Sequence, residues 1–257
     1  MTLGFIDEVG RNVLFLNQIL RTMIKKKIKF HEIYLQIWKV TTDSLPTTAV
    51  AGFFVGAIMA VQFGMQLEEF GALGYLGGLA TSGTFREVGP LLIAFLLSGK
   101  VGAFTSAELG TMRVTEQLDA IRCLGADPLQ EIIVPRFIGI VISSFFLLAV
   151  GLMMSVLGGM GMASIFSGVH SEEYLRHVPR ILSPISILSG LVKCGFFSLV
   201  LASICTYQGY TTRGGAKGVG RSVVRTAVAT MIGIVVADWF TSFIGEIIIT
   251  AIRGYPS

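Results

Sequence analysis

The sequence predicts an all-α integral membrane protein: five transmembrane helices, an N-terminal amphipathic interfacial helix and one charged cytoplasmic helix. Of the 257 residues, 53% are hydrophobic and only 14% are charged, whereas soluble domains carry charge on ~25% of their positions. The apolar residues gather in five runs long enough to cross a bilayer as helices. Thirty-one glycines against seven prolines indicate close helix packing, because glycine lets helix backbones approach one another in lipid.

Residues 1–44 are predicted to form an amphipathic segment on the cytoplasmic face of the membrane. A basic KKKIK run at 25–29 suits contact with anionic headgroups. Before this run, apolar residues recur at helical spacing: Phe5, Val9, Val13, Leu16, Leu20 and Ile24. The alternative is a solvated helix packed on another subunit. No uninterrupted apolar core follows a basic start, so no signal peptide is predicted.

Residues 45–257 hold the five predicted spans. Windows of ~19 residues place them at 45–67, 88–107, 137–169, 181–210 and 226–252. The third is so long that it must tilt or project beyond the bilayer. The glycine-rich run 71–81 is too short to cross, so we expect it to be re-entrant or to lie at the surface.

The first span carries small residues at every fourth position, a ladder made of Gly52, Gly56, Ala60 and Gly64. Such a stripe predicts a close helix crossing. The crossing could lie within the chain or join it to a second copy, and the length of the ladder makes a homodimer attractive.

The distribution of basic residues predicts the orientation. One set of flanks has fifteen lysines and arginines: Arg11, Arg21, Lys25, Lys26, Lys27, Lys29, Lys39, Lys100, Arg113, Arg122, Arg136, Arg213, Lys217, Arg221 and Arg225. The opposite flanks have four: Arg86, Arg176, Arg180 and Arg253. Cytoplasmic loops carry the excess of basic residues, and five spans separate the termini. We therefore expect a cytoplasmic N-terminus and a periplasmic C-terminus.

A charged stretch, 108–136, interrupts the apolar runs. Residues 108–124 are predicted to form one amphipathic helix ~25 Å long, with Asp119 and Arg122 close enough to pair. Gly125 ends this helix. The next helix is capped by Asp127, with Pro128 at its first position and Gln130 in a capping box. The mixed charges suit a protein surface better than lipid, although the helix could also be a simple spacer.

Three motifs carry a resemblance to a known family: AELGTMRVTEQLDAIRCLGADPLQEIIVPR at 107–136, FREVGPLL at 85–92 and GGAKGVGRSVVRTAV at 214–228. They resemble MlaE-type permeases, the membrane subunits of ABC transporters that move phospholipids in diderm bacteria. Related permeases serve Mce lipid-uptake systems and chloroplast lipid import. The resemblance covers most of residues 45–252, and Lys217 stands where the family usually has an acidic residue.

The resemblance implies a permease that moves phospholipid between the bacterial inner membrane and a periplasmic MCE-domain lipid carrier, for outer-membrane lipid homeostasis. It identifies the helix at 108–124 as a coupling helix seated in a groove of a cytoplasmic ATPase. The implied coupling residues are Glu108, Gly110, Arg113, Glu116 and Asp119. The expected partners are this ATPase, a second copy of the chain and the MCE carrier. A small STAS-domain regulator could join them, and no nucleic acid is expected.

Residues 215–222, GAKGVGRS, nearly match the phosphate loop of nucleotide-binding proteins, with Arg221 in place of the lysine. That loop needs a buried strand before it and an α/β domain around it, and there is no room for either between two spans. We expect a basic, glycine-rich cytoplasmic loop instead. The chain is therefore predicted not to be an enzyme, and ATP and Mg²⁺ would be bound by the partner ATPase. The three cysteines show no disulfide or metal-site spacing.

Charged residues at membrane depth are the candidate substrate site, because each is expensive in lipid. Lys193 lies ~18 Å into its predicted span, and Arg86 and Glu87 lie at the periplasmic side of another. We expect these three to form a polar cluster in which one cation pairs with Glu87 and the other meets a lipid phosphate. The matching family positions resemble charged residues of the lipid pocket, and Leu67 and Phe70 could wall its acyl-chain part. A purely structural ion pair is the alternative.

Two rival functions use the same features. An ion- or proton-coupled secondary transporter would use Lys193, Asp238 and Glu246, but such carriers often show inverted repeats and none is evident here. A structural reading of Asp238 and Glu246 is favoured. A non-transporting membrane scaffold would use the glycine ladder and the basic tail.

Overall fold

A computed structural model describes residues 2–25, 29–182 and 184–253. No strand occurs among these residues, and nearly all of them are helical. Five stretches are long and apolar enough to cross a membrane: Phe30–Glu69, Leu73–Val114, Leu129–Phe166, Pro184–Tyr210 and Gly215–Ile247. The predicted all-α membrane fold with five spans is confirmed.

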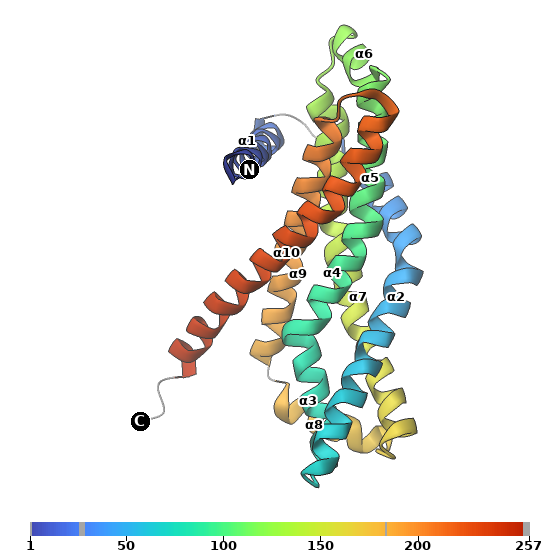
Figure 1. Cartoon of the computed structure of the whole chain (residues 1–257), viewed down its shortest axis with the longest axis vertical. Coiled ribbons are helices and arrows are strands. Elements are labelled where there is room, and N and C mark those ends of the chain that lie inside the picture. Colours follow the sequence, from blue (N-terminus) through green and yellow to red (C-terminus); the bar gives the residue numbers. More distant parts are fainter. Residues whose placement is uncertain (1, 26–28, 183, 254–257) are drawn as a thin grey trace. The chain divides into compact units, whose positions relative to one another are not determined.

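The helices follow one another along the colour ramp of Figure 1. The α-helices are α1 (Thr2–Lys25), α2 (Phe30–Glu69), α3 (Leu76–Gly83), α4 (Gly89–Leu97), α5 (Ala103–Val114), α6 (Gln117–Cys123), α7 (Val134–Phe166), α8 (Ser171–Ile181), α9 (Pro184–Tyr210) and α10 (Gly215–Arg253). A 3₁₀ turn, η1 (Leu73–Tyr75), precedes α3. Three π-helical turns join other segments: η2 (Thr84–Val88), η3 (Ser98–Gly102) and η4 (Leu129–Ile133).

Three segments differ from their predicted form. The first span begins at Phe30, well before residue 45 and inside the segment expected to be interfacial. The run 71–81 is not a separate piece, because most of it belongs to the continuous helical stretch Leu73–Val114 that is long and apolar enough to span. Residues 214–228 are not a loop, because α10 already begins at Gly215.

The chain divides into two compact units. Unit 1 takes in the described residues up to Asp43, together with Leu97–Ser144 and Ser198–Gly233. Unit 2 takes in Ser44–Leu96, Phe145–Phe197 and the described residues from Ile234 onward. The helices α2, α7, α9 and α10 each contribute a segment to both units.

In unit 2 the small-residue ladder of α2 packs on α7. A Cβ added at Gly52 would overlap the backbone of Gly151, and one at Gly56 would overlap the carbonyl oxygen of Ser155. Ala60 is 1% exposed and belongs to the same buried core as Ala163 of α7. The predicted close crossing therefore exists, and it is made within the chain.

The glycines at the start of the second span pack α3 against α8, which lie side by side in Figure 1. A Cβ at Gly77 would overlap the carbonyl oxygen of Tyr174. The Tyr174 side chain is buried, its hydroxyl lies 3.2 Å from the Thr81 hydroxyl, and burial raises the pKa of its phenol. These glycines thus allow a close helix contact, which explains why the run did not form a separate surface piece.

In unit 1 one face of α1 packs on the end of α9. Phe15 is buried and stacks on Tyr210 with ring centroids 5.3 Å apart. Asn12 accepts a hydrogen bond from the Ser203 hydroxyl at 2.7 Å. Val13 stays 59% exposed, so an apolar face remains for a membrane surface, as the prediction of an interfacial helix requires. The Phe5 side chain and residues 26–28 of the basic run lie outside the described residues.

Candidate functional site

The candidate substrate site begins with a buried ammonium in unit 2. Lys193, on α9, is 1% exposed, and its Nζ donates hydrogen bonds to Glu87 Oε2 at 2.6 Å and to Ser242 Oγ at 2.7 Å. Asp238 Oδ1, on α10, lies 3.0 Å from the same Nζ as an ion-pair contact. That contact does not have hydrogen-bond geometry, and Oδ1 accepts no hydrogen bond from the described residues.

The cluster joins three segments that are distant in the sequence. Glu87 comes from the π turn η2, Lys193 from α9, and Asp238 and Ser242 from α10. The Ser242 hydroxyl also lies 3.1 Å from Glu87 Oε2. Two carboxylates face one ammonium, so the charge of Lys193 is fully neutralised. A further anion next to this ammonium would be repelled by the surplus carboxylate.

Arg86 lies outside these contacts, although the sequence predicted one cluster of Arg86, Glu87 and Lys193. Its Nη2 donates to Glu246 Oε2 at 2.9 Å, and the two side chains are 39% and 65% exposed. The predicted pairing of Glu87 with one cation is therefore found for Lys193. Arg86 is left in an exposed ion pair, of a kind that contributes only about 0–1 kcal/mol.

An apolar cavity of about 410 Å³ adjoins the cluster between α9 and α10 of unit 2. Its walls include Leu188, Val192, Phe196, Phe240 and Ile244, and among the described residues Lys193 is the one charged side chain that lines it. Gly245, which precedes the carboxylate partner of Arg86, also lines it. An apolar space with a polar group at its wall has the composition of a lipid or small-molecule pocket.

Leu67 and Phe70, expected to wall the acyl-chain part, are not among the residues lining this cavity. Leu67 packs against the buried core that contains Tyr174. Phe70, just after α2, is 81% exposed. Their assignment rested on apolar character near the end of a span. In the structure Leu67 packs on a core shared by several helices, and Phe70 is exposed.

Asp238 and Ser242 complete the cluster, and the sequence pointed to only one of them. Asp238 stood out as an intramembrane carboxylate, but its partner depends on the register between α9 and α10. Ser242 is an ordinary residue in an apolar run and had no signal of its own. Glu246, the other carboxylate of α10, takes Arg86 as its partner.

The second candidate site is the α5–α6 elbow, residues 103–123 of unit 1. The sequence predicted one helix over 108–124, and this prediction was wrong. The helix ends at Val114, Glu116 adopts the left-handed conformation with φ 62°, and α6 begins at Gln117. Because the chain turns there, the predicted apolar face is split: Leu118 is fully buried, whereas Leu124 is 85% exposed.

Ion pairs across the turn hold the elbow together. Arg113 Nη1 lies 2.9 and 3.1 Å from the two carboxylate oxygens of Asp119, and Arg122 Nη1 lies 3.0 Å from Asp119 Oδ1. The predicted pairing of Asp119 with Arg122 is thus confirmed. Arg122 also donates to the Tyr210 hydroxyl at 2.6 Å, which ties α6 to the end of α9.

The remaining coupling residues divide into buried and exposed groups. Glu108 receives ion pairs from Lys39 and Arg136, both at 3.2 Å, so it holds α5 to α2 and α7. Gly110 faces the segment just after α9, where an added Cβ would lie 3.0 Å from the Thr212 hydroxyl oxygen. Glu116 is exposed and has no ion-pair partner in the described part of the chain. Of the five residues, Glu116 is therefore the one most available to a partner protein.

The turn after α6 has the predicted stop at Gly125 and the predicted cap at Asp127. Gly125 has φ 81°, a conformation that favours glycine. Asp127 Oδ1 accepts the backbone N–H of Leu129 at 3.0 Å, and the chain re-enters a helix through the π turn η4. Glu131 of this turn pairs with Lys29 at 2.6 Å and raises the pKa of that ammonium.

Five apolar spans, an intramembrane charge cluster beside an apolar cavity and a charged elbow between spans define a multi-pass membrane protein of the transporter type. A profile of the family described as "Permease MlaE" matches residues 33–244. The chain belongs to this permease family, and it is an ABC transporter permease.

Relatives of the chain match nearly its full length. It is 34% identical to a probable ABC transporter permease protein of Rickettsia conorii, over 93% of this chain and 92% of that protein. It is 28% identical to the intermembrane phospholipid transport system permease protein MlaE of Haemophilus influenzae, over 95% and 98% of the two chains. The chloroplastic protein TRIGALACTOSYLDIACYLGLYCEROL 1 of Arabidopsis thaliana is 32% identical, over 88% and 64%.

Proposed function

We propose that this permease moves phospholipid between the bacterial inner membrane and a periplasmic MCE-domain carrier, for outer-membrane lipid homeostasis. The observation that carries the proposal is the apolar cavity of unit 2, with a neutralised charge cluster at its wall and the exposed Arg86–Glu246 ion pair next to its lining residue Gly245. The Haemophilus influenzae relative is an intermembrane phospholipid transport system permease protein, and this similarity supports the choice of substrate.

In this proposal the three membrane charges have different roles. Lys193 is a structural ammonium, because Glu87 and Asp238 already neutralise it. Arg86 contacts the lipid phosphate, because its ion pair with Glu246 is exposed and a phosphate can replace that carboxylate. The apolar lining of the cavity receives the acyl chains.

The energy for transport comes from a cytoplasmic ATPase that binds the α5–α6 elbow and carries ATP and Mg²⁺. An ABC permease implies such a partner, and the exposed carboxylate of Glu116 gives it a charged contact. The N-terminus lies in the cytoplasm and the C-terminus in the periplasm, as the distribution of basic residues indicates. A second copy of the chain completes the membrane part, and a STAS-domain protein is a further candidate partner on the cytoplasmic side.

An ion-coupled carrier is the weaker alternative. It would need Lys193, Asp238 and Glu246 to change partners or protonation during transport. All three are engaged in ion pairs, Lys193 with Asp238 and Glu246 with Arg86, so the structural role that the sequence favoured for the two carboxylates agrees with their contacts.

The substrate role is tested by Arg86→Gln in proteoliposomes containing the permease, its ATPase and the carrier. Loss of one charge-assisted phosphate contact should slow ATP-dependent transfer of labelled phospholipid about tenfold. The matched control is Arg176→Gln, an exposed arginine on α8 that touches neither the cluster nor the cavity. Equal transfer by both variants and the unmodified protein would remove Arg86 from the site.

Exchanging the signs of the buried pair tests the role of Lys193. The double variant Glu87→Lys/Lys193→Glu retains opposite charges at the same two positions. Folding together with transport supports a structural pair. Folding with transport lost would instead assign the headgroup contact to Lys193.

The ATPase contact is tested by Glu116→Lys, because this side chain has no partner within the elbow to disturb. Adding Asp119→Lys would also break the pairs with Arg113 and Arg122, so the single variant is cleaner. Copurification of the ATPase should fall strongly with Glu116→Lys and stay unchanged with Glu172→Lys on α8. The docking role of the elbow would be refuted if ATPase association and transport both survive in Glu116→Lys and in Glu116→Lys/Asp119→Lys.

A further inference from the structure

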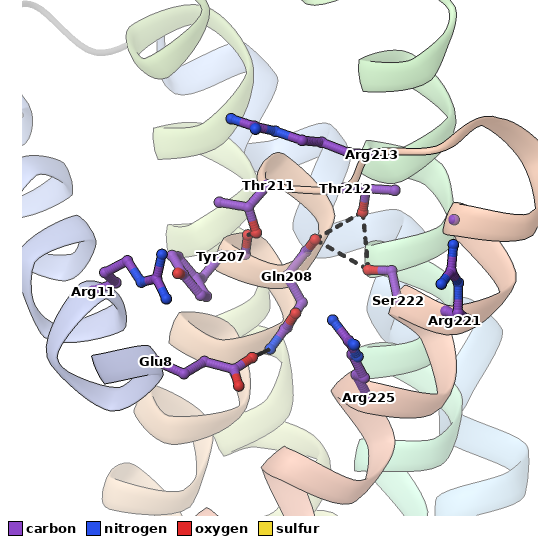
Figure 2. A pocket seen from close by; sticks show the side chains of 11 residues that line it. Glu8, Arg11, Tyr207, Gln208, Thr211, Thr212, Arg213, Arg221, Ser222 and Arg225 are labelled. Atoms are coloured by element: carbon purple, nitrogen blue, oxygen red, sulfur yellow. Dashed lines mark hydrogen bonds between the residues drawn. The ribbon is translucent and has the colours of Figure 1, made fainter. Parts of the chain in front are cut away.

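Unit 1 contains a second pocket, apart from the cavity of unit 2. It has a volume of about 580 Å³ and lies among α1, the end of α9 and the first turns of α10. Figure 2 shows Arg221 and Arg225 projecting from α10 and Arg11 from α1, with Arg213 on the segment between α9 and α10. Of the described residues that line it, four are arginines and one, Glu8, is acidic.

The charges of this pocket are not balanced from within. The Glu8 carboxylate accepts a hydrogen bond from the Gln208 amide at 2.7 Å, and Arg11 pairs with Asp7 at 2.7 Å. Arg213, Arg221 and Arg225 have no ion-pair partner among the residues that the structure describes. Three uncompensated guanidiniums around one hollow create a strongly positive site, which favours an anion.

The base of the pocket is held by a compact hydrogen-bond network. The hydroxyls of Thr212 and Ser222 lie 2.8 and 3.0 Å from the carbonyl oxygen of Gln208 and 2.9 Å from each other, as the dashed lines in Figure 2 show. This network joins the end of α9 to the second turn of α10. Arg221 and Arg225 therefore project from a fixed base, which reduces the ordering needed when an anion binds.

The chemistry of the lining favours phosphate among anions. Arginine is the side chain that best matches phosphate, because its planar fork donates two parallel hydrogen bonds to two oxygens. A phosphate group presents enough oxygens for more than one such fork, whereas a carboxylate presents only two. The start of α10 adds the partial positive charge of a helix N-terminus, and the Arg221 guanidinium lies near Gly214 just before it.

The near-match to a phosphate loop lies at this pocket. Gly218, Arg221 and Ser222 of GAKGVGRS all line it. The segment is the beginning of α10, and no strand occurs in the described part of the chain, so the geometry of a nucleotide-binding loop is absent. The arginines offer phosphate recognition without that machinery.

We propose that this pocket binds a phosphate-bearing anion, either the phosphorylated headgroup of an anionic phospholipid or free inorganic phosphate. The volume exceeds that of a bare phosphate and leaves room for a headgroup. Thr212, at the base, faces Gly110 of α5, so the base of the pocket lies against the helix that begins the elbow. The proposal does not rest on transport through the cavity of unit 2.

The test measures phosphate binding to the full-length permease purified with its ATPase in neutral detergent. One arm titrates inorganic phosphate by calorimetry. The other adds phosphatidic acid or phosphatidylcholine to mixed micelles and counts bound lipid by native mass spectrometry. Arg221→Gln/Arg225→Gln should weaken binding about tenfold or more. The control Lys217→Gln/Arg21→Gln removes the same charge outside the pocket and should change binding less than about twofold.

A third variant keeps every arginine in place. Thr211→Glu adds a carboxylate to the lining, which should neutralise the guanidiniums. It should therefore weaken binding of the same probe that the unmodified protein binds. The elution profile and melting temperature of the double arginine variant show whether it folds. If it does not fold, the Thr211→Glu variant provides the test.

The outcomes separate the two sources of phosphate. Binding of inorganic phosphate alone identifies the free anion, and selective binding of phosphatidic acid alone identifies the headgroup; both support the pocket. The proposal is overturned if neither probe binds, or if both double variants lose binding equally. It is also overturned if the arginine variant loses only the ATPase, because the arginines would then serve an acidic protein surface.

Discussion

Removing the buried ammonium of Lys193 is the most direct perturbation of the charge cluster. Lys193→Met keeps a similar volume but leaves Glu87 and Asp238 facing each other without a cation. Breaking a buried ion pair from one side costs about 3–5 kcal/mol. Glu87 is 50% exposed and Asp238 18% exposed, so solvent partly compensates for the missing ammonium. We therefore expect the free energy of unfolding to fall by about 3 kcal/mol, the lower end of this range.

For a chain of this size, a loss of about 3 kcal/mol lowers the melting temperature by roughly 6–12 °C. The assay is the fraction of detergent-solubilised permease that remains monodisperse after heating. Removing all three charges, in Lys193→Met/Glu87→Gln/Asp238→Asn, should recover most of the loss, because no unpaired charge remains in the interior. The control Lys217→Met removes an exposed lysine and should leave the melting temperature unchanged.

Two results would refute this reasoning. The first is a Lys193→Met protein that melts within about 2 °C of the unmodified protein, since the ion pairs would then contribute little. The second is a triple variant no more stable than the single one. That result would assign the loss to packing around the lysine side chain and not to its charge.

Three further predictions concern helix packing and the elbow. Gly56→Ala should lower stability by about 1–3 kcal/mol, because its Cβ overlaps a carbonyl of α7, whereas Gly161→Ala, where nothing lies within 4 Å, should be neutral or stabilising in the same melting assay. Glu116→Gly should raise stability by about 1 kcal/mol in thermal unfolding, because glycine adopts φ 62° without strain, and an unchanged melting temperature would contradict it. Tyr174→Phe should cost about 1 kcal/mol in denaturant unfolding, while Tyr75→Phe at an exposed ring should cost little. Because burial raises the pKa of Tyr174, its stabilising effect is complete below pH ~10 and should fall as the pH rises through the higher folded value.

Hydropathy and local capping signals were enough to predict the five spans and the turn at Gly125 and Asp127. Both depend on properties of a short stretch, namely its apolar length and the conformational preference of single residues. The pairing of Glu87 with Lys193 could be anticipated too, because a buried charge needs a partner and few candidates exist at membrane depth.

Features that depend on tertiary contacts were not predictable in the same way. No glycine or proline in the sequence marks the break at Glu116. The ion pairs between Arg113 and Asp119 form only once the chain has turned there. The partner of Asp238 depends on how two helices are placed along each other. The ladder at Gly52 and Gly56 predicted a close crossing, but a small-residue stripe does not say which helix it meets.

The π turns η2 and η3 change the direction in which the side chains of the second span point around the helix axis. Each turn amounts to one extra residue in an α-helical rod, so residues beyond it point about 100° away from where 3.6-residue counting would put them. In unit 1, where η3 precedes α5, a helical wheel drawn from Leu97 onward therefore places Glu108 and Gly110 about 100° away from the faces that they occupy, and this backbone insertion determines which faces α5 presents.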